Sequence, residues 1–233
     1  MHNARGSVCV AASLLLSSAG TSVTRADVTF SDSVFNNTDW SVNTVNIATG
    51  GTSVGAQAAG GNPGTGREVT NTMNLLGTIY SFHAYGSTPA TTYQPSVDGA
   101  VASVEWTIDG RWLSGIGGQG QGIALGAMQG GNLYYADYDI TGSTGAWNTF
   151  LATGLVSSDF TPFNGGPAID FSAGGAAIRF GFVVGNYAPD QAYFNTCIYD
   201  NYSVTIRTVP TPAAGATVLG MGGLGMLRAR RRR

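Results

Sequence analysis

Apolar and polar residues alternate one for one in several short segments of this sequence, and this period of two is the feature that most constrains the fold. The alternation runs through residues 28–34, 101–109, 178–184 and 202–207, and Gly, Asn, Pro and Ser bound these segments. Successive side chains of a β-strand point to opposite faces, so the pattern predicts strands that are buried on one side. No long amphipathic helix pattern and no internal repeat is found.

The composition favours one all-β domain between two processing segments. Apolar residues make up 43% of the 233 residues, and 35 residues are glycine. Residues 27–208 have room for about ten to twelve short strands. We expect a two-sheet β-sandwich of the jelly-roll type, similar to concanavalin or galactose-binding folds. The Gly-rich stretch 50–66 is expected to form a loop over one edge of the sandwich.

Residues 1–26 have the layout of a secretory signal peptide. Arg5 precedes a short apolar stretch at residues 8–16, and Thr24 and Ala26 place small side chains three residues and one residue before a cleavage site. We predict cleavage before Asp27, with a site near Ala19 as the alternative. The chain is therefore expected to be exported.

Residues 209–233 form a tail of three parts: a Pro motif, an apolar run at 213–227 and a basic end. The motif and the basic end consist of Val209, Pro210, Thr211, Pro212, Arg228, Arg230, Arg231, Arg232 and Arg233. A helix over the apolar run would be roughly 22 Å long, which is short of the roughly 30 Å hydrocarbon core. We predict a short apolar helix that enters the membrane transiently, with the arginines on the cytoplasmic side.

This layout resembles the PEP-CTERM sorting signal, which a membrane protease-transpeptidase of the exosortase type recognises. The family motif reads V-P-E-P, and Thr211 stands here in the position of the Glu. The resemblance implies an exosortase-type processing enzyme as a partner. It also implies a location at the cell surface or in an exopolysaccharide matrix.

Several short motifs of the body add a second resemblance. They are Phe30-x-Asp32, Asp39-Trp40, Gly60-Gly61-Asn62-Pro63-Gly64 with Arg67, and Asp200-Asn201-Tyr202-Ser203-Val204. With these motifs the body resembles lectin-like sandwich domains of secreted bacterial proteins and bacterial relatives of the laminin domain IV family. The resemblance implies the sandwich fold and no particular chemistry.

The charge of the body argues against a nucleic-acid partner. All 13 Asp and Glu lie after residue 26, whereas only four of the 11 Arg lie between residues 27 and 208, and Lys is absent. The predicted body therefore carries a net charge of about −9, which repels phosphate backbones.

The residues for common catalytic sites are scarce in the body. Cys197 and His83 are its only Cys and His, too few for a zinc site or for a nucleophile with its base. We expect Cys197 to be a small buried side chain and His83 a structural strand residue. Glu105 is the one weak catalytic candidate, as part of a carboxylate pair in a polysaccharide hydrolase or lyase.

Two kinds of binding site remain as predictions. Asp32 and Asp200 lie near the first and last strands and could share a structural Ca²⁺, the only cofactor considered. Aromatic side chains could present flat faces to a sugar, and the candidates are Trp40, Trp112, Trp147, Tyr134 and Tyr135. For each of these rings, packing in the core or in a turn is the alternative.

Three functions are compatible with these features. The preferred one is an exported, non-catalytic protein of the cell surface or exopolysaccharide matrix with a glycan-binding sandwich. The alternatives are a polysaccharide-active hydrolase or lyase that uses Glu105, and a self-associating structural protein of the envelope.

Overall fold

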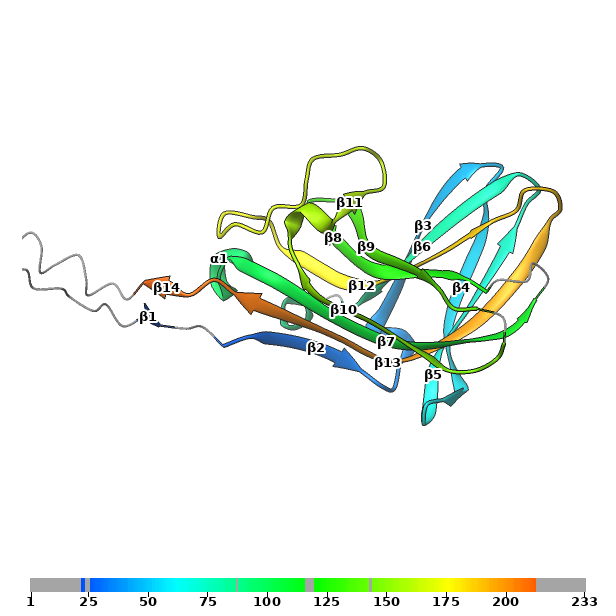
Figure 1. Ribbon diagram of the computed structural model, residues 1–233, viewed down its shortest axis with the longest axis horizontal. Coiled ribbons are helices and arrows are strands. Elements are labelled where there is room, and N and C mark those ends of the chain that lie inside the picture. Colours follow the sequence, from blue (N-terminus) through cyan, green and yellow to red (C-terminus); the bar gives the residue numbers. More distant parts are fainter. Residues whose placement is uncertain (1–21, 24–25, 87, 116–119, 143, 213–233) are drawn as a thin grey trace, which may run out of the picture. The chain divides into compact units, whose positions relative to one another are not determined.

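The computed structural model describes residues 22–23, 26–86, 88–115, 120–142 and 144–212 (Figure 1). The chain divides into two compact units, one of Met1–Val23 with Pro210–Arg233 and one of Thr24–Val209. In the first unit, strand β1 (Ser22–Val23) pairs with β14 (Thr211–Pro212). The predicted apolar stretch of the signal peptide, the apolar tail helix and the arginine cluster lie outside the described residues.

The unit Thr24–Val209 is a sandwich of two antiparallel sheets, which confirms the predicted fold class. Sheet I has the order β10 (Asn148–Leu155), β7 (Val101–Gly115), β13 (Tyr193–Thr208), β5 (Gly64–Met73), β4 (Gly51–Gly61), and β2 (Val28–Asp32) also pairs with β13. Sheet II has the order β11 (Thr161–Pro162), β9 (Asn132–Ile140), β8 (Gly122–Gln129), β12 (Ile178–Tyr187), β6 (Gly77–Tyr85), β3 (Trp40–Ala48).

The described helices of this unit are single turns. They are the α-helix α1 (Pro95–Asp98) and the 3-10 helices η1 (Asn37–Asp39), η2 (Pro89–Thr91) and η3 (Ser157–Asp159). Among the described residues, no helix has the length and apolar character needed to cross a membrane.

The period-two segments of the sequence supply the core between the two sheets. Trp106 and Ile108 of β7 and Phe180 and Phe182 of β12 are at most 1% exposed and belong to one buried cluster. Fully burying such an apolar side chain contributes about 1.5–3 kcal/mol. The sandwich is therefore held by the inward-facing half of each alternating strand.

The Gly-rich stretch 50–66 is not the loop that the sequence predicted. It forms β4 and the start of β5, an antiparallel pair that runs from Gly51–Met73 to Gly61–Gly64 with a register shift between Ala59 and Gly61. The glycines serve close packing here: a Cβ built on Gly55 would lie 2.6 Å from the His83 ring. Glycine-rich segments are typical of loops. A strand that needs glycines for close approach of the opposite sheet is therefore predicted as a loop.

A buried polar chain joins the two sheets. The Arg67 Nε donates to the His83 Nδ1 at 3.0 Å, the His83 Nε2 lies 3.1 Å from the Ser81 Oγ, and the Ser81 Oγ lies 2.9 Å from the Ser53 Oγ. His83 is thus a structural strand residue, as predicted. Burial lowers the pKa of His83 well below its usual value, and the neighbouring Arg67 lowers it further.

Candidate functional site

The outer face of sheet II has a floor of small residues on its two central strands. Ile123 and Leu125 of β8 point into the main core. The residues that alternate with them, which include Gly122 and Gly126, therefore point outward. Gly122 and Gly126 of β8 lie directly opposite Gly185 and Gly181 of β12. Strands with such small outward residues leave room for the large side chains of the flanking strands.

Aromatic rings from the flanking strands lie over these glycines. A Cβ built on Gly185 would lie 2.8 Å from the Tyr80 ring, and one on Gly126 would lie 2.6 Å from the Phe82 ring. Phe163 joins the row, with ring centroids 5.1 Å from Tyr80 and 4.8 Å from Tyr135. The outer face of sheet II is therefore an aromatic surface built on a glycine floor.

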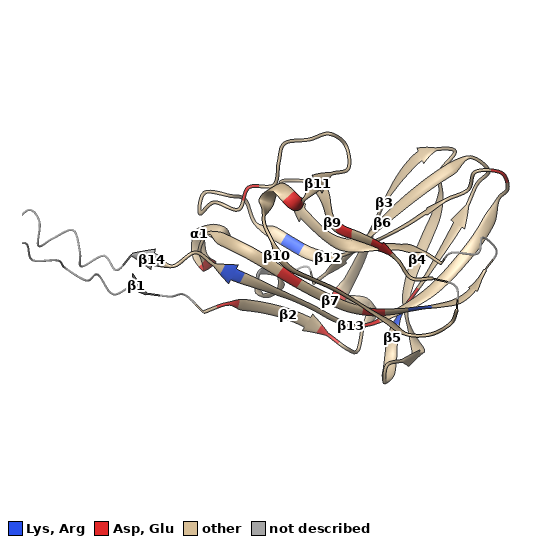
Figure 2. Cartoon of the chain, in the orientation of Figure 1, with Lys and Arg blue, Asp and Glu red and all other residues tan. Residues whose placement is uncertain are grey.

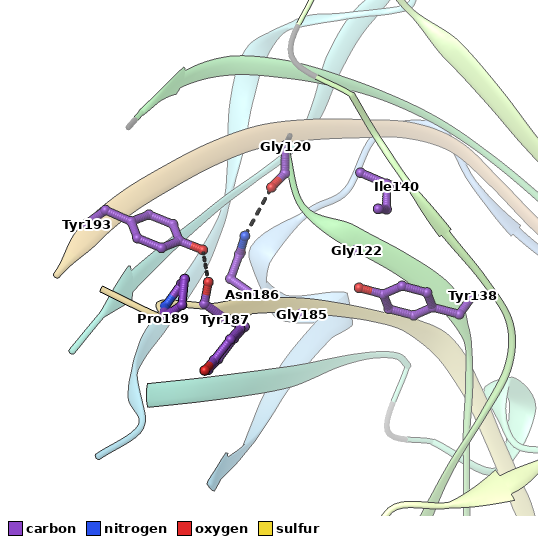
Figure 3. A pocket seen from close by; sticks show the side chains of 9 residues that line it. All are labelled: Gly120, Gly122, Tyr138, Ile140, Gly185, Asn186, Tyr187, Pro189 and Tyr193. Carbon is purple, nitrogen blue, oxygen red and sulfur yellow. Dashed lines mark hydrogen bonds between the residues drawn. The ribbon is translucent and has the colours of Figure 1, made fainter. Parts of the chain in front are cut away.

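A pocket of about 360 Å³ lies at one end of this surface (Figure 3). Its lining consists of Gly120, Gly122, Tyr138, Ile140, Gly185, Asn186, Tyr187, Pro189 and Tyr193. Figure 3 shows Tyr138 and Tyr193 on opposite sides of Asn186. Tyr138 and Tyr187 are 52% and 56% exposed, so these two rings are open to a ligand.

Side-chain amides fix one wall of the pocket. Asn186 and Asn195 both donate from Nδ2 to the Gly120 carbonyl, at 3.0 and 2.9 Å. The Gln121 Nε2 donates to the carbonyls of Val69 and Asn195 at 3.1 and 2.9 Å. These bonds tie the segment that enters β8 to both sheets, which gives the pocket a preformed wall.

The polar groups of the pocket are neutral. Burial raises the pKa of Tyr138 first, and the neighbouring Tyr80, Tyr193 and Tyr135 raise it further. Burial also raises the pKa of Tyr193, whose hydroxyl donates to the Tyr187 carbonyl at 2.9 Å. Flat rings with protonated hydroxyls and amides suit a ligand that has apolar faces and many hydroxyl groups.

Two of the predicted sugar-stacking residues are core residues instead. Trp40 is 6% exposed, packs against Phe35, Tyr85, Phe182 and Tyr202, and donates its indole N–H to Asp32 at 2.7 Å. Tyr134 is 1% exposed and donates to the Pro167 carbonyl. Both rings are enclosed by protein, so the prediction that they face a ligand is wrong.

The other three candidates lie in different places. Trp112 is half-buried against the core, and the half-buried Trp147 ring is covered by the Arg111 guanidinium, 5.0 Å from the ring centre. Tyr135 is half-buried on the outer face of sheet II, the face that holds the pocket. Tyr135 is the one predicted stacking residue near the candidate site.

The proposed calcium ligands Asp32 and Asp200 lie close together. Asp32 pairs with Tyr202 across β2 and β13, two residues from Asp200. The carboxylate of Asp32 accepts the N–H groups of Val34, Phe35 and Trp40, and that of Asp200 accepts those of Asn62 and Asn201.

These hydrogen bonds already satisfy both carboxylates with protein donors. Burial raises the pKa of Asp200, and the neighbouring Asp109 and Asp32 add to the rise. In the described part of the chain, no three His, Cys, Asp or Glu side chains gather as a metal site would need. The structural calcium ion stays a prediction.

Glu105 lies on the outer face of sheet I, away from the pocket. Its carboxylate accepts two bonds from the Arg207 Nη2, at 3.0 and 3.1 Å, and one from Nε at 3.2 Å. Arg207 also pairs with Asp27. An acid or base would have to leave this guanidinium before acting, so the geometry does not favour Glu105 as a catalytic group.

Cys197 is buried, and burial raises its pKa to about 11.

The sequence interpretation missed Tyr138, Tyr187 and Tyr193. These residues come from three strands or strand ends that only the sheet register brings together. One signal was present: Gly122 and Gly126, and likewise Gly181 and Gly185, repeat at a spacing of four on one side of a strand. Two strands with the same small outward positions indicate a shared floor.

Comparisons with known proteins give the fold alone. No protein-family model matches the chain, and no curated protein matches it. Among solved structures, it is similar to a family 11 carbohydrate-binding module from Clostridium thermocellum, in complex with a β-1,3-1,4-mixed-linked tetrasaccharide. The identity is 11%, the match covers 79% of this chain and 97% of that one, and the TM-score is 0.45.

A second similar structure is the CBM22-1 xylan-binding domain of Paenibacillus barcinonensis, with 8% identity and a TM-score of 0.40. The match covers 82% of this chain and 99% of that domain. Likeness at this level carries no function to this chain.

Proposed function

We propose that this chain is an exported glycan-binding protein of the cell surface or exopolysaccharide matrix, and that the pocket on sheet II takes the glycan. The observation that carries this proposal is the convergence of Tyr138, Tyr187 and Tyr193 on a preformed pocket without charged lining residues. Sugar rings bind through their apolar faces to aromatic rings and through their hydroxyls to neutral donors and acceptors.

The export half of the proposal is supported by the sequence. Residues 1–26 have the layout of a signal peptide, and the three-part tail 209–233 resembles the PEP-CTERM sorting signal. An exosortase-type enzyme would then process the tail at or near Val209–Pro212. The sorting of the chain is tested by microscopy with antibodies against residues 27–208. Cells that make the full chain are compared with cells that make a chain without residues 209–233. Unchanged surface labelling of the truncated chain would contradict the proposal.

Glycan binding is tested by single aromatic substitutions. Polysaccharides are first screened by affinity electrophoresis, and the affinity for one that binds is then measured for Tyr138→Ala and Tyr187→Ala. Each ring is about half exposed, so the fold should survive and affinity should fall by about tenfold.

Trp147→Ala is the matched control because Trp147 is an aromatic candidate outside the pocket. Its affinity should equal that of the unmodified protein. Loss of binding in Trp147→Ala but not in Tyr138→Ala would place the glycan at Trp147, outside the pocket. Failure of the protein to bind any polysaccharide in the screen would refute the proposed function.

A further inference from the structure

Three carboxylates are next in sequence to residues that line the proposed glycan pocket. Asp137 and Asp139 flank the lining residue Tyr138 on β9, and Asp190 follows the lining residue Pro189. All three are exposed. In Figure 2, Asp and Glu positions mark β9 and the turn between β12 and β13. The charged residues next to the lining are therefore all acidic, and Asp137, Asp139 and Asp190 are called the rim below.

The arginines of the described body are all engaged elsewhere. Arg67 is buried against His83, Arg111 lies over Trp147, and Arg207 pairs with Glu105. Arg179 is on the same sheet but donates to the Gly86 carbonyl and lies six residues before Gly185, which is roughly 20 Å along a strand. The described residues thus offer no cation to balance the rim.

The three tyrosines of the pocket also favour a positively charged ligand. The face of an aromatic ring is electrostatically negative and attracts ammonium groups within about 6 Å. Asp137 and Asp139 also repel each other: burial is the larger cause of the raised pKa of Asp137, and the neighbouring Asp139 raises it further. A bound cation would relieve that repulsion, whereas a uronate or a sulfate would add to it.

We propose that the pocket selects glycans with free amino groups, such as N-unsubstituted hexosamine polymers, over neutral glycans, and that it rejects polyanionic ones. The inference rests on the proposed function and adds the class of ligand. Asp137, Asp139 and Asp190 supply the charge, and the tyrosine faces receive the ammonium groups.

The test compares three hexasaccharides on the purified protein by calorimetry at about pH 6, where amino groups of this kind are protonated. The probes are β-1,4-linked glucosamine, β-1,4-linked N-acetylglucosamine and a galacturonate oligomer. We expect the glucosamine hexamer to bind about tenfold more tightly than the acetylated one. The galacturonate oligomer should not bind measurably.

The variant D137N/D139N/D190N removes the rim charge with little change in shape. Asp137 has a positive φ of 57°, a conformation that Asn also adopts readily. At position 139, Asn keeps the side-chain oxygen that accepts the Ile140 N–H. The preference for glucosamine should fall to within about twofold. Asp190→Asn alone should lower it, whereas Glu68→Gln, a matched change of charge on β5 of sheet I, should not.

The outcomes separate this inference from the proposed function. Equal affinity for the amino and acetyl hexamers, or an unchanged preference in D137N/D139N/D190N, would overturn the charge selectivity and leave glycan binding intact. Tighter binding of galacturonate would also overturn it. If no hexamer binds, the ligand class is wrong, and the polysaccharide screen with Tyr138→Ala then decides whether the protein binds glycans at all.

Discussion

At the scale of single residues, the most unusual group is the buried pair of Arg67 and His83. The Arg67 Nε is a donor, so the His83 Nδ1 must carry the lone pair and Nε2 the proton. A second proton on this ring would face the guanidinium in a buried site. Burial also lowers the pKa of Arg67, to about 10. The pair therefore joins the sheets only while His83 is neutral.

This predicts a stability that depends on pH. The folded pKa of His83 lies well below its unfolded value of about 6.5, so the unfolded chain binds the proton first. The free energy of unfolding is then highest above about pH 6.5 and falls as the pH drops, by up to about 1.4 kcal/mol per unit. Urea titrations between about pH 7.5 and pH 5 measure the slope. The same slope in His83→Gln would mean that another group causes it.

At the scale of elements, the glycine floor of sheet II decides where the aromatic rings lie. Phe82 is 1% exposed and occupies the space above Gly126, between Val183 and the adjoining rings. A side chain on Gly126 has nowhere to go without moving that ring. At Gly122 and Gly185, which line the pocket, the missing side chains likewise make room for the Tyr138 and Tyr80 rings.

Gly126→Ala should therefore be destabilising. Its Cβ would lie 2.6 Å from the Phe82 ring and 3.0 Å from Val183, an overpacking that costs about 1–3 kcal/mol. Gly174→Ala is the control, because the nearest atom would be 3.7 Å away. Chemical unfolding of both variants measures the difference. Equal stabilities would show that the floor tolerates a methyl group and that the rings adapt.

At the scale of the whole molecule, the sandwich could be predicted from the sequence but the site could not. The strands around Trp106, Phe182 and Val204 follow the alternation because burial of one face is a local pattern. The β4 strand and the tyrosine pocket depend instead on which strands become neighbours. Trp40 shows the same limit, since a Trp beside polar residues looks exposed until the core encloses it.

The body also separates its chain ends from the pocket. Val28 of β2 pairs with Ile206 of β13, so the chain enters and leaves at the same end of this strand pair. Tyr193, which lines the pocket, starts the same β13, thirteen residues before Ile206, or roughly 40 Å along the strand. A body held through its C-terminal side would leave the pocket free, as the proposed function requires.

The measurement that tests the central claim most directly is an NMR titration of the protein with a glycan oligomer selected in the binding screen. We predict that the backbone signals that shift belong to Gly122, Tyr138, Gly185 and Tyr187 of sheet II and to Tyr193 at the start of β13. The signals around Glu105 and Trp147 should stay in place. Shifts confined to those two regions, with the tyrosine pocket unchanged, would contradict the account.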